Sequence, residues 1–472
     1  MKKSSILLLL VVGIVTAVAL YYAWANWAGA RELQSVLAEL ERKKESVRLE
    51  DFIPPHVPDD QNVAAAPIFR EYVASTNNSR LGRFLQTWKI LGTLSLKDQR
   101  LINMAKKINL KFSGDESAAR SLILEALNQT APVLEEVREA LRRPKVEWPI
   151  DYSNVLQTPM NYITPCLDVA KMFCGRALAE LELGLPDKAA QDTMAILAMA
   201  EVVVPPRMLI SELVRELNLQ MASDVICDGL RRGAWTDSNL SDFSKSFPEE
   251  NLTVHIADGL RVDRVGVQMW MADLKLSLAA LEMINTLNPQ DEGSKRFFKL
   301  ICQLRPAGWA HRDRAHHIVA IQQLIECLSA NKGISPNEVD RIETSFRKPS
   351  KWDRFTTPLS AITSPVFIGI LKKVVYAQTQ LESTRTACAV ERYRLVNKRL
   401  PASLGDLVPA FLPAVPNDPI TGRPLLYKPK EDGAFVVYGV GWNQIDDGGS
   451  VQPTPPKKPI EEADWGVDIS KG

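Results

Sequence analysis

The hydrophobic pattern begins with one long apolar run at the N-terminus. Residues 6–24, ILLLLVVGIVTAVALYYAW, contain no charged side chain, and Lys2 and Lys3 precede them. A helix needs about 20 apolar residues to cross a bilayer core of about 30 Å. Aromatic residues, which favour the headgroup layer, gather at the far end of the run: Tyr21, Tyr22, Trp24 and Trp27. The pattern predicts a transmembrane anchor over residues 1–28, with the lysines on the cytoplasmic side.

A cleaved signal peptide is the alternative interpretation of this run. Ala23-Trp24-Ala25 and Ala28-Gly29-Ala30 both have the small-x-small pattern of a cleavage site. The apolar stretch of a signal peptide usually has about 7–15 residues, and this run is longer. Its length therefore favours a retained anchor, and cleavage stays the alternative.

The pattern after the anchor changes to a charged segment. Residues 31–50 combine acidic and basic side chains at helical spacing, which is typical of a solvated helix face. The prolines of IPPHVPDD, residues 53–60, then interrupt any helix, because proline lacks an amide donor and biases the preceding residue toward extended backbone. We expect a charged stalk and a proline-rich hinge over residues 29–60.

Helical periodicity dominates residues 61–346. Ala170, Phe173, Ala177 and Leu181 are three or four positions apart, and a turn at residues 184–187 leads into a second apolar stripe. This spacing predicts a helical hairpin, and further helices follow near residues 210–232, 257–287 and 309–330. The segment RALAELELGLPDKAAQDTMAIL resembles one tetratricopeptide unit, but only once along the chain. We expect a helical ectodomain built as an irregular bundle, with a tetratricopeptide-like array as the alternative.

The last third begins with a polar, basic segment. We interpret residues 347–358, RKPSKWDRFTTP, as a linker, with a basic recognition patch as the alternative. A long helix then runs from about Val366 or Leu371 to Lys398, and Pro401 ends it. Two β-branched and aromatic runs follow, PLLYKP and AFVVYGV, on either side of a Lys-Glu-Asp-Gly loop that is typical of a hairpin. The prolines between 401 and 424 therefore predict a change from helix to a small sheet within residues 359–472.

Composition excludes several classes of protein. Apolar residues are 46% and charged residues 24% of the chain, which is ordinary globular composition, and the formal net charge is +1. Nothing in this balance attracts nucleic acid. The six cysteines contain no C-x-x-C pair, so the common zinc and redox motifs are absent from the sequence.

Catalytic signals are also weak. The sequence contains no G-x-S-x-G, H-E-x-x-H or phosphate-loop motif. His311 and His316 in HRDRAHH are five positions apart, whereas two metal ligands on a helix favour a separation of four. We expect a protein without an enzymatic site, and the alternative is a hydrolase of exported polymers whose site is not recognisable among the helical hairpins.

The C-terminal quarter resembles a known domain. The segments follow in the order ERYRLVNKRLPASLGDLVP, LPAVPNDPITGRPLLY, GAFVVYGVGWNQIDDGG and ADWGVDI. Their order is similar to that of the major pseudopilin of type II secretion, where a long helix leads through a Leu-Pro turn and an Asp-Pro-x-x-Gly-x-Pro-x-x-Tyr loop into a small sheet. The whole chain also resembles uncharacterised membrane-anchored bacterial proteins with a helical ectodomain and this ending. The resemblance implies a pseudopilin-like α+β cap.

The resemblance carries two further implications. Pseudopilin domains hold calcium after the sheet, so it implies a calcium site at Asn443, Asp446 and Asp447; a solvated Asp-Gly-Gly turn is the alternative. A pseudopilin has a prepilin-peptidase site before its apolar helix, and this chain has none before Ile6. Assembly into a pseudopilus through the N-terminal helix is therefore not expected.

Together these patterns predict a mainly α protein with a membrane anchor, a helical ectodomain and a small α+β cap. We expect a single-pass protein of the bacterial inner membrane with most of its chain in the periplasm. A secreted form follows if the N-terminal segment is cleaved. Its expected role is that of a scaffold or interaction protein, with the membrane and proteins of the cell envelope, such as a secretion or assembly machine, as partners.

Overall fold

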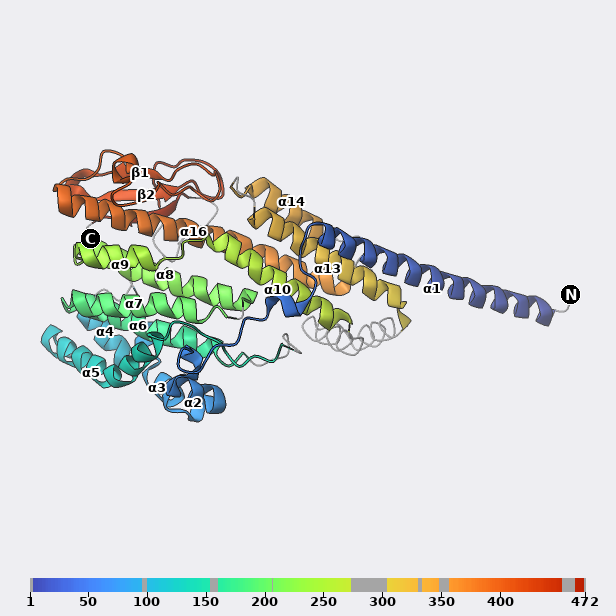
Figure 1. Cartoon of the computed structure of the whole chain (residues 1–472), viewed down its shortest axis with the longest axis horizontal. Coiled ribbons are helices and arrows are strands. Elements are labelled where there is room, and N and C mark those ends of the chain that lie inside the picture. The colour runs from blue at the N-terminus through green and yellow to red at the C-terminus, as the bar shows by residue number, and fades with distance from the viewer. Residues whose placement is uncertain are drawn as a thin grey trace.

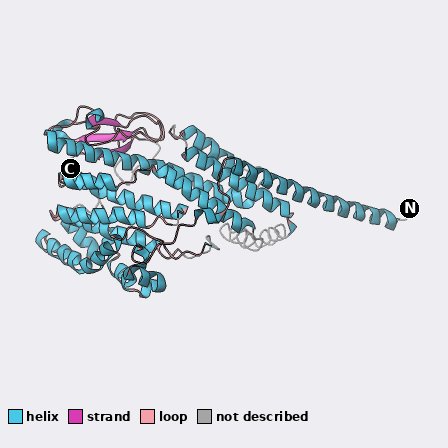
Figure 2. Cartoon of the chain, in the orientation of Figure 1, coloured by secondary structure: helices cyan, strands magenta, loops and turns pink. Residues whose placement is uncertain are grey.

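The chain is mainly helical, and a small sheet lies near the C-terminus (Figures 1 and 2). The structure is a computed structural model, and it describes residues 3–95, 100–152, 160–205, 207–272, 304–329, 333–347, 356–451 and 463–470. This architecture confirms the prediction of a mainly α fold with an apolar N-terminal helix and strands close to the C-terminus.

The helices differ widely in length. Those of the first half are α1 (Lys3–Arg42), α2 (Pro67–Ser75), α3 (Arg80–Trp88), α4 (Leu101–Ile108), α5 (Glu116–Leu141), α6 (Ile163–Glu182), α7 (Pro186–Val202) and α8 (Leu209–Arg232). Those of the second half are α9 (Asp237–Ser246), α10 (Leu252–Ala272), α13 (Ala307–Leu328), α14 (Pro336–Arg347) and α16 (Pro358–Asn397). The strands are β1 (Leu426–Pro429), β2 (Phe435–Gly439) and β3 (Trp465–Ile469).

Helix α1 is one unbroken helix of 40 residues. Its apolar part is long and apolar enough to cross a membrane, a property that anchors and signal sequences share. In Figure 1 this part projects beyond the rest of the described chain. The second part of α1 is not the exposed stalk that we expected, because Leu33 and Leu40 are buried against Ala315 and Ile318 of α13. Several charged residues of this part are exposed, whereas Glu32 pairs with His316 of α13.

The predicted helical hairpin is present as α6 and α7. Ala170, Phe173, Ala177 and Leu181 are all buried, as their spacing predicts. Gly184 has a positive φ of 73°, which a glycine adopts without a Cβ penalty, and it reverses the chain before Pro186 begins α7. Helix α8 packs against both members of the hairpin. These helices form the middle tier of the body, below α9 and α16 in Figure 1.

Several predicted segments extend beyond the described residues. The helix expected over 257–287 is described as α10 up to Ala272, and the helix expected over 309–330 corresponds to α13. Most of the predicted linker, residues 348–355, lies outside the described residues. The long final helix begins earlier than expected, at Pro358, and ends with Lys398 in the left-handed conformation.

The proline-rich segment forms the turn from α16 into the sheet. After a short 3₁₀ helix at Leu404–Leu407, Asp418 accepts hydrogen bonds from the amide of Ile420 at 3.0 Å and from the hydroxyl of Thr421 at 2.9 Å. Burial raises the pKa of Asp418, while these bonds oppose the shift. A Cβ on Gly439 would lie only 2.9 Å from the Asp418 carboxyl carbon, so glycine lets this loop contact the end of β2.

The sheet is antiparallel and has the order β1-β2-β3. Its first two strands are the predicted hairpin, with Tyr427 opposite Val437. The third strand, in which Val467 lies opposite Val437, comes from the ADWGVDI segment and was not predicted as a strand. The buried face of β2 packs on α16, where the ring of Tyr376 meets Trp465 edge-on at 5.5 Å between centroids.

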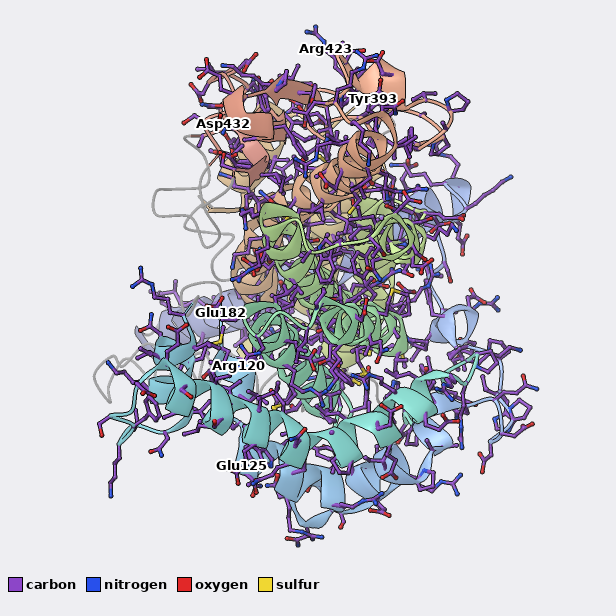
Figure 3. The ribbon with its side chains drawn as sticks, turned by 90° about the vertical axis from the view of Figure 1, so that its left-hand side faces the viewer. Arg120, Glu125, Glu182, Tyr393, Arg423 and Asp432 are labelled. Carbon is purple, nitrogen blue, oxygen red and sulfur yellow. The ribbon has the colours of Figure 1, made fainter. Side chains whose placement is uncertain are left out.

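One continuous core joins the helical body to the sheet. Its buried side chains extend from Val63 near the N-terminal end of the body to Ile469 in β3. The end-on view shows three tiers: α5 with Arg120 and Glu125 at the bottom, the helices around Glu182 in the middle, and the sheet region with Arg423 and Asp432 at the top (Figure 3). The cap is therefore packed as part of the body rather than attached to it as a separate unit.

Candidate functional site

The closest contact between the N-terminal helix and the body lies where α1 packs against α13. A Cβ on Gly29 would clash with the backbone carbonyl of Gly308, and a Cβ on Gly308 would clash with the carbonyl of Ala25. The two backbones therefore approach so closely that only glycine fits at both positions. The small residues of the possible cleavage sites have a packing role at this contact.

Polar groups of α1 complete the start of α13. The N-cap residue of α13 is Pro306, whose side chain makes no capping hydrogen bond. Instead, the amide of Gly308 donates to the side-chain oxygen of Asn26 at 2.8 Å. The hydroxyl of Tyr22 donates to the carbonyl of Leu304. Because the first amides of a helix have no partner within it, α1 supplies one of the partners that α13 needs.

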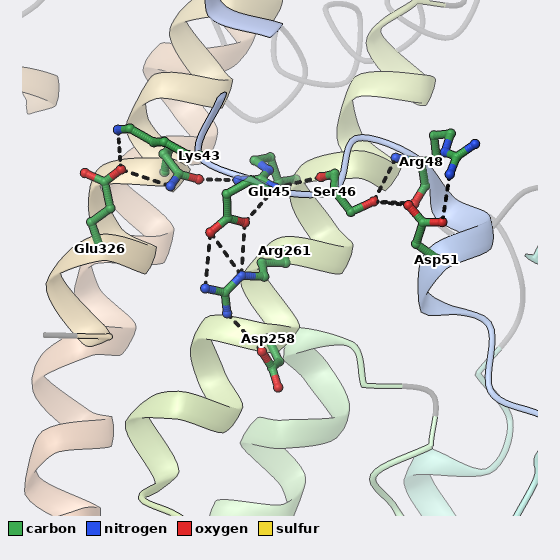
Figure 4. A network of polar contacts seen from close by, with 10 residues as sticks. Lys43, Glu45, Ser46, Arg48, Asp51, Asp258, Arg261 and Glu326 are labelled. Atoms are coloured by element: carbon green, nitrogen blue, oxygen red, sulfur yellow. Dashed lines mark hydrogen bonds and ion pairs between the residues drawn. The ribbon is translucent and has the colours of Figure 1, made fainter. Parts of the chain in front are cut away.

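A network of charged side chains joins the end of α1 to α10 and α13 (Figure 4). The Glu45 carboxylate lies 3.0 Å from Nε of Arg261 and 3.2 Å from Nη2 of Arg264. Arg264 is fully buried, and it also donates to the carbonyl of Ser46 at 2.8 Å. Lys43 extends the network to Glu326 of α13 at 2.6 Å. We call these residues, 43–46 with Arg261, Arg264 and Glu326, the junction network.

Burial and neighbouring charges shift the pKa values of the junction network in opposite directions. Burial alone would raise the pKa of Glu45, but the hydrogen bonds and charges of Arg261 and Arg264 outweigh it and lower the pKa. Burial lowers the pKa of Arg264, and Glu45 opposes that shift. Removal of the Glu45 charge would leave a buried guanidinium without its counter-charge, which is costly in a low-dielectric interior. Glu45 is therefore the central residue of the network.

The histidines of HRDRAHH lie on α13, the helix that packs against α1. His317 is fully buried, and burial together with the nearby Arg264 charge lowers its pKa to about 4. His316 lies 3.5 Å from a carboxylate oxygen of Glu32 on α1. Within the described ranges, no group of three or more histidine, cysteine or acidic side chains is placed to hold a metal ion.

The three candidate calcium ligands lie on one loop after β2. Asp446 accepts from the hydroxyl of Tyr438 at 3.2 Å and from the amide of Gly448 at 2.9 Å. The amide group of Asn443 donates to Asp447 at 3.3 Å. The loop thus satisfies part of its own acceptor capacity, as the turn alternative expects.

Sequence reasoning missed the residue that holds this loop in place. Asp464, which precedes β3 and is 2% exposed, accepts from the amides of Asp447 at 3.2 Å and Gly449 at 2.9 Å. Burial raises its pKa, and the nearby Asp446 and Asp447 charges add to the shift. Only the aspartate at the start of ADWGVDI could have indicated this role in the sequence.

Carboxylates with raised pKa values lie inside the helical body. Burial raises the pKa of Glu180 to about 8, and that of Glu212 and Glu216 to about 7. Two clefts in the described part, of about 380 and 310 Å³, lie near Trp148 and near Lys171. None of the three carboxylates lines either cleft. These three buried carboxylates therefore give the hydrolase alternative no support at these clefts.

Comparisons with known proteins identify no relative. No protein-family model matches the chain, and neither the curated proteins nor the solved structures contain a match.

Proposed function

We propose that this protein is a membrane-anchored scaffold outside the cytoplasm, with a retained N-terminal helix that is also a structural part of its body. The observation that supports this proposal most directly is the close contact between Gly29 and Gly308. Cleavage after Ala30 would remove both Asn26, the partner of α13, and Gly29, and would expose the glycine surface at the start of α13. Cleavage after Ala25 would remove Tyr22 and the Ala25 carbonyl that packs on Gly308. A helix that the body needs for its own packing is better explained as a permanent anchor than as a removable signal.

The orientation and the compartment belong to the same proposal. Lys2 and Lys3 precede the apolar run, and positive charges beside a first span favour the cytoplasmic side. The body then lies in the periplasm of a bacterial cell, attached to the inner membrane. A helical body whose α6–α7 hairpin resembles a tetratricopeptide unit, joined to a pseudopilin-like cap, suits a role in protein binding at a secretion or envelope-assembly machine.

Two experiments test this proposal. The intact mass of the native protein, extracted from membranes, should equal that of the full chain, and high-pH washing should leave it in the membrane fraction. A mature N-terminus at residue 26 or 31 would refute the retained anchor. Crosslinking in intact cells, followed by identification of the partners, should recover envelope secretion or assembly components; recovery of cytosolic proteins alone would refute the location.

A further inference from the structure

Helices α1 and α13 run parallel and stay in register. Tyr22 contacts Leu304 and Asn26 contacts Gly308, both with a separation of 282 residues, and Lys43 contacts Glu326 with a separation of 283. Each residue from 304 onward therefore lies at the height of the α1 residue about 282 positions earlier. The position of a residue along α1 therefore also gives the level of its paired residue at the start of α13.

This register places the start of α13 at the edge of the apolar run. Residues 6–24 of a helix extend over about 28 Å, which is close to the thickness of a bilayer core. Leu304 lies level with Tyr22, close to the end of that run. If α1 spans the membrane, as the proposed function states, then the turn that leads into α13, residues 304–306, lies at the outer membrane surface. We call residues 304–306 the entry turn.

The exposed side chains near the level of the entry turn are of the kinds that favour a lipid headgroup layer. Leu304 is 59% exposed, and Trp24 and Trp27 are 60% and 58% exposed. The guanidinium of Arg31 lies 5.3 Å from the centroid of the Trp27 ring. Tryptophan prefers the membrane interface, and arginine beside it reaches the phosphates.

The two exposed tryptophans of α1, Trp24 and Trp27, face away from the body. Trp24, Trp27 and Arg31 follow each other at spacings of three and four, so they share one face of the helix. Ala25, Gly29 and Leu33 occupy a different face, which packs on α13. The packing of α1 against the body therefore leaves the aromatic face uncovered at the height of the headgroups.

We propose that the entry turn and the Trp24, Trp27 and Arg31 face of α1 together rest in the outer headgroup layer of a phospholipid bilayer. The body then contacts lipid directly, in addition to its attachment through the anchor. This inference rests on the proposed function, because only a spanning α1 fixes the height of the entry turn. Lipid is favoured over a protein partner because lipid already surrounds α1 at this height.

Depth-dependent fluorescence quenching in the full-length protein tests the contact. An environment-sensitive fluorescent amino acid is placed at Leu304, at Val319 or at Leu9, in separate samples of the chain in phospholipid nanodiscs that contain brominated lipids. Val319 is the matched control, because it is 39% exposed on α13 and lies about 18 Å beyond the first residue of that helix. Leu9 is 61% exposed in the apolar run and reports insertion of the anchor itself.

The expected result is strong quenching at Leu9 and quenching at Leu304 at least threefold greater than at Val319. Quenching at Leu9 with equal, weak quenching at Leu304 and Val319 overturns the lipid contact but leaves the anchor intact. A probe at Leu304 that is shielded from water but not quenched indicates a protein partner, and it also overturns this inference. Weak quenching at Leu9 refutes the anchor, and the lipid contact with it.

Discussion

Gly29 and Gly308 face each other where α1 packs on α13, and each lacks room for a Cβ because of the other helix's backbone. This pair makes the N-terminal helix part of the folded body. Replacement of either glycine tests the contact without any change of charge.

Gly29→Leu should destabilise the body, because the larger side chain forces α1 away from α13. Overpacked positions typically lose about 1–3 kcal/mol. Thermal denaturation in detergent micelles should show a lower midpoint for this variant. Gly13→Leu is the matched control, because no atom lies within 4 Å of a Cβ at Gly13. Equal midpoints for the two variants would contradict the close packing of α1 on the body.

Glu45→Gln should also destabilise the protein, because it leaves the buried Arg264 without its counter-charge. The breaking of a buried pair in this way costs about 3 kcal/mol. The pKa of Glu45 is lowered in the folded state, so its contribution is complete above its unfolded pKa and is lost as the pH falls through the folded value. The denaturant midpoints of the natural protein and of Glu45→Gln should therefore differ at pH 7 and converge in acid.

The control for Glu45→Gln is Glu139→Gln, which removes an exposed ion pair with Arg142 outside the network. Exposed pairs contribute little to stability. If Glu139→Gln lowers the midpoint at pH 7 as much as Glu45→Gln does, the junction network is not the stabilising contact.

Glu216→Gln should make the protein more stable at neutral pH. Burial raises the pKa of Glu216 to about 7, although Lys373 opposes the shift. A carboxyl with a raised pKa loses its favourable contribution as the pH rises from the unfolded pKa to the folded one. The gain of the variant over the natural protein should therefore grow by about 3 kcal/mol between pH 4.5 and 8.

Denaturant titrations at several pH values measure this gain. Glu125→Gln on the exposed side of α5 serves as the control (Figure 3), and its difference from the natural protein should stay constant. A constant difference for Glu216→Gln as well would show that Glu216 ionises normally in the folded chain.

Asp418→Ala should loosen the sheet region. The change removes the acceptor for Ile420 and Thr421 and leaves a buried amide without a partner, at a cost of about 1–3 kcal/mol. Hydrogen exchange of residues 426–439 should accelerate in this variant, while that of α6 stays the same. The exposed Glu431→Ala is the control, and unchanged exchange in Asp418→Ala would show that the loop does not support β2.

Local patterns predicted the elements that have strong signals. The period of apolar residues predicted the α6–α7 hairpin, and turn chemistry with β-branched runs predicted β1 and β2. The long helix α16 was also predicted, but the burial of its middle was not, because Thr379, Thr384 and Thr386 are polar and yet fully buried. Their hydroxyls donate to backbone carbonyls four residues earlier, at 2.7–3.0 Å, which lets polar side chains pack in the core.

The candidate site was predictable only in part. The proposed anchor follows from an apolar run that is local in sequence, whereas the junction network joins residues more than 200 positions apart. Charged residues at 43–50 have the same spacing whether they face water or a buried arginine, so we expected a solvated stalk. The glycines at 29 and 308 carry no pattern of their own, since close helix packing depends on a pairing that only the fold creates.

If α1 spans a membrane, as the proposed function states, its continuity also limits how the protein can move there. No proline or other break separates the apolar run from the part of α1 that packs on α13, so the anchor and the body must tilt together. A change in bilayer thickness that tilts the anchor would swing the sheet region, at the opposite end of the long axis in Figure 1, through a much wider arc. Partners that bind there would meet a surface whose height depends on the lipid below it.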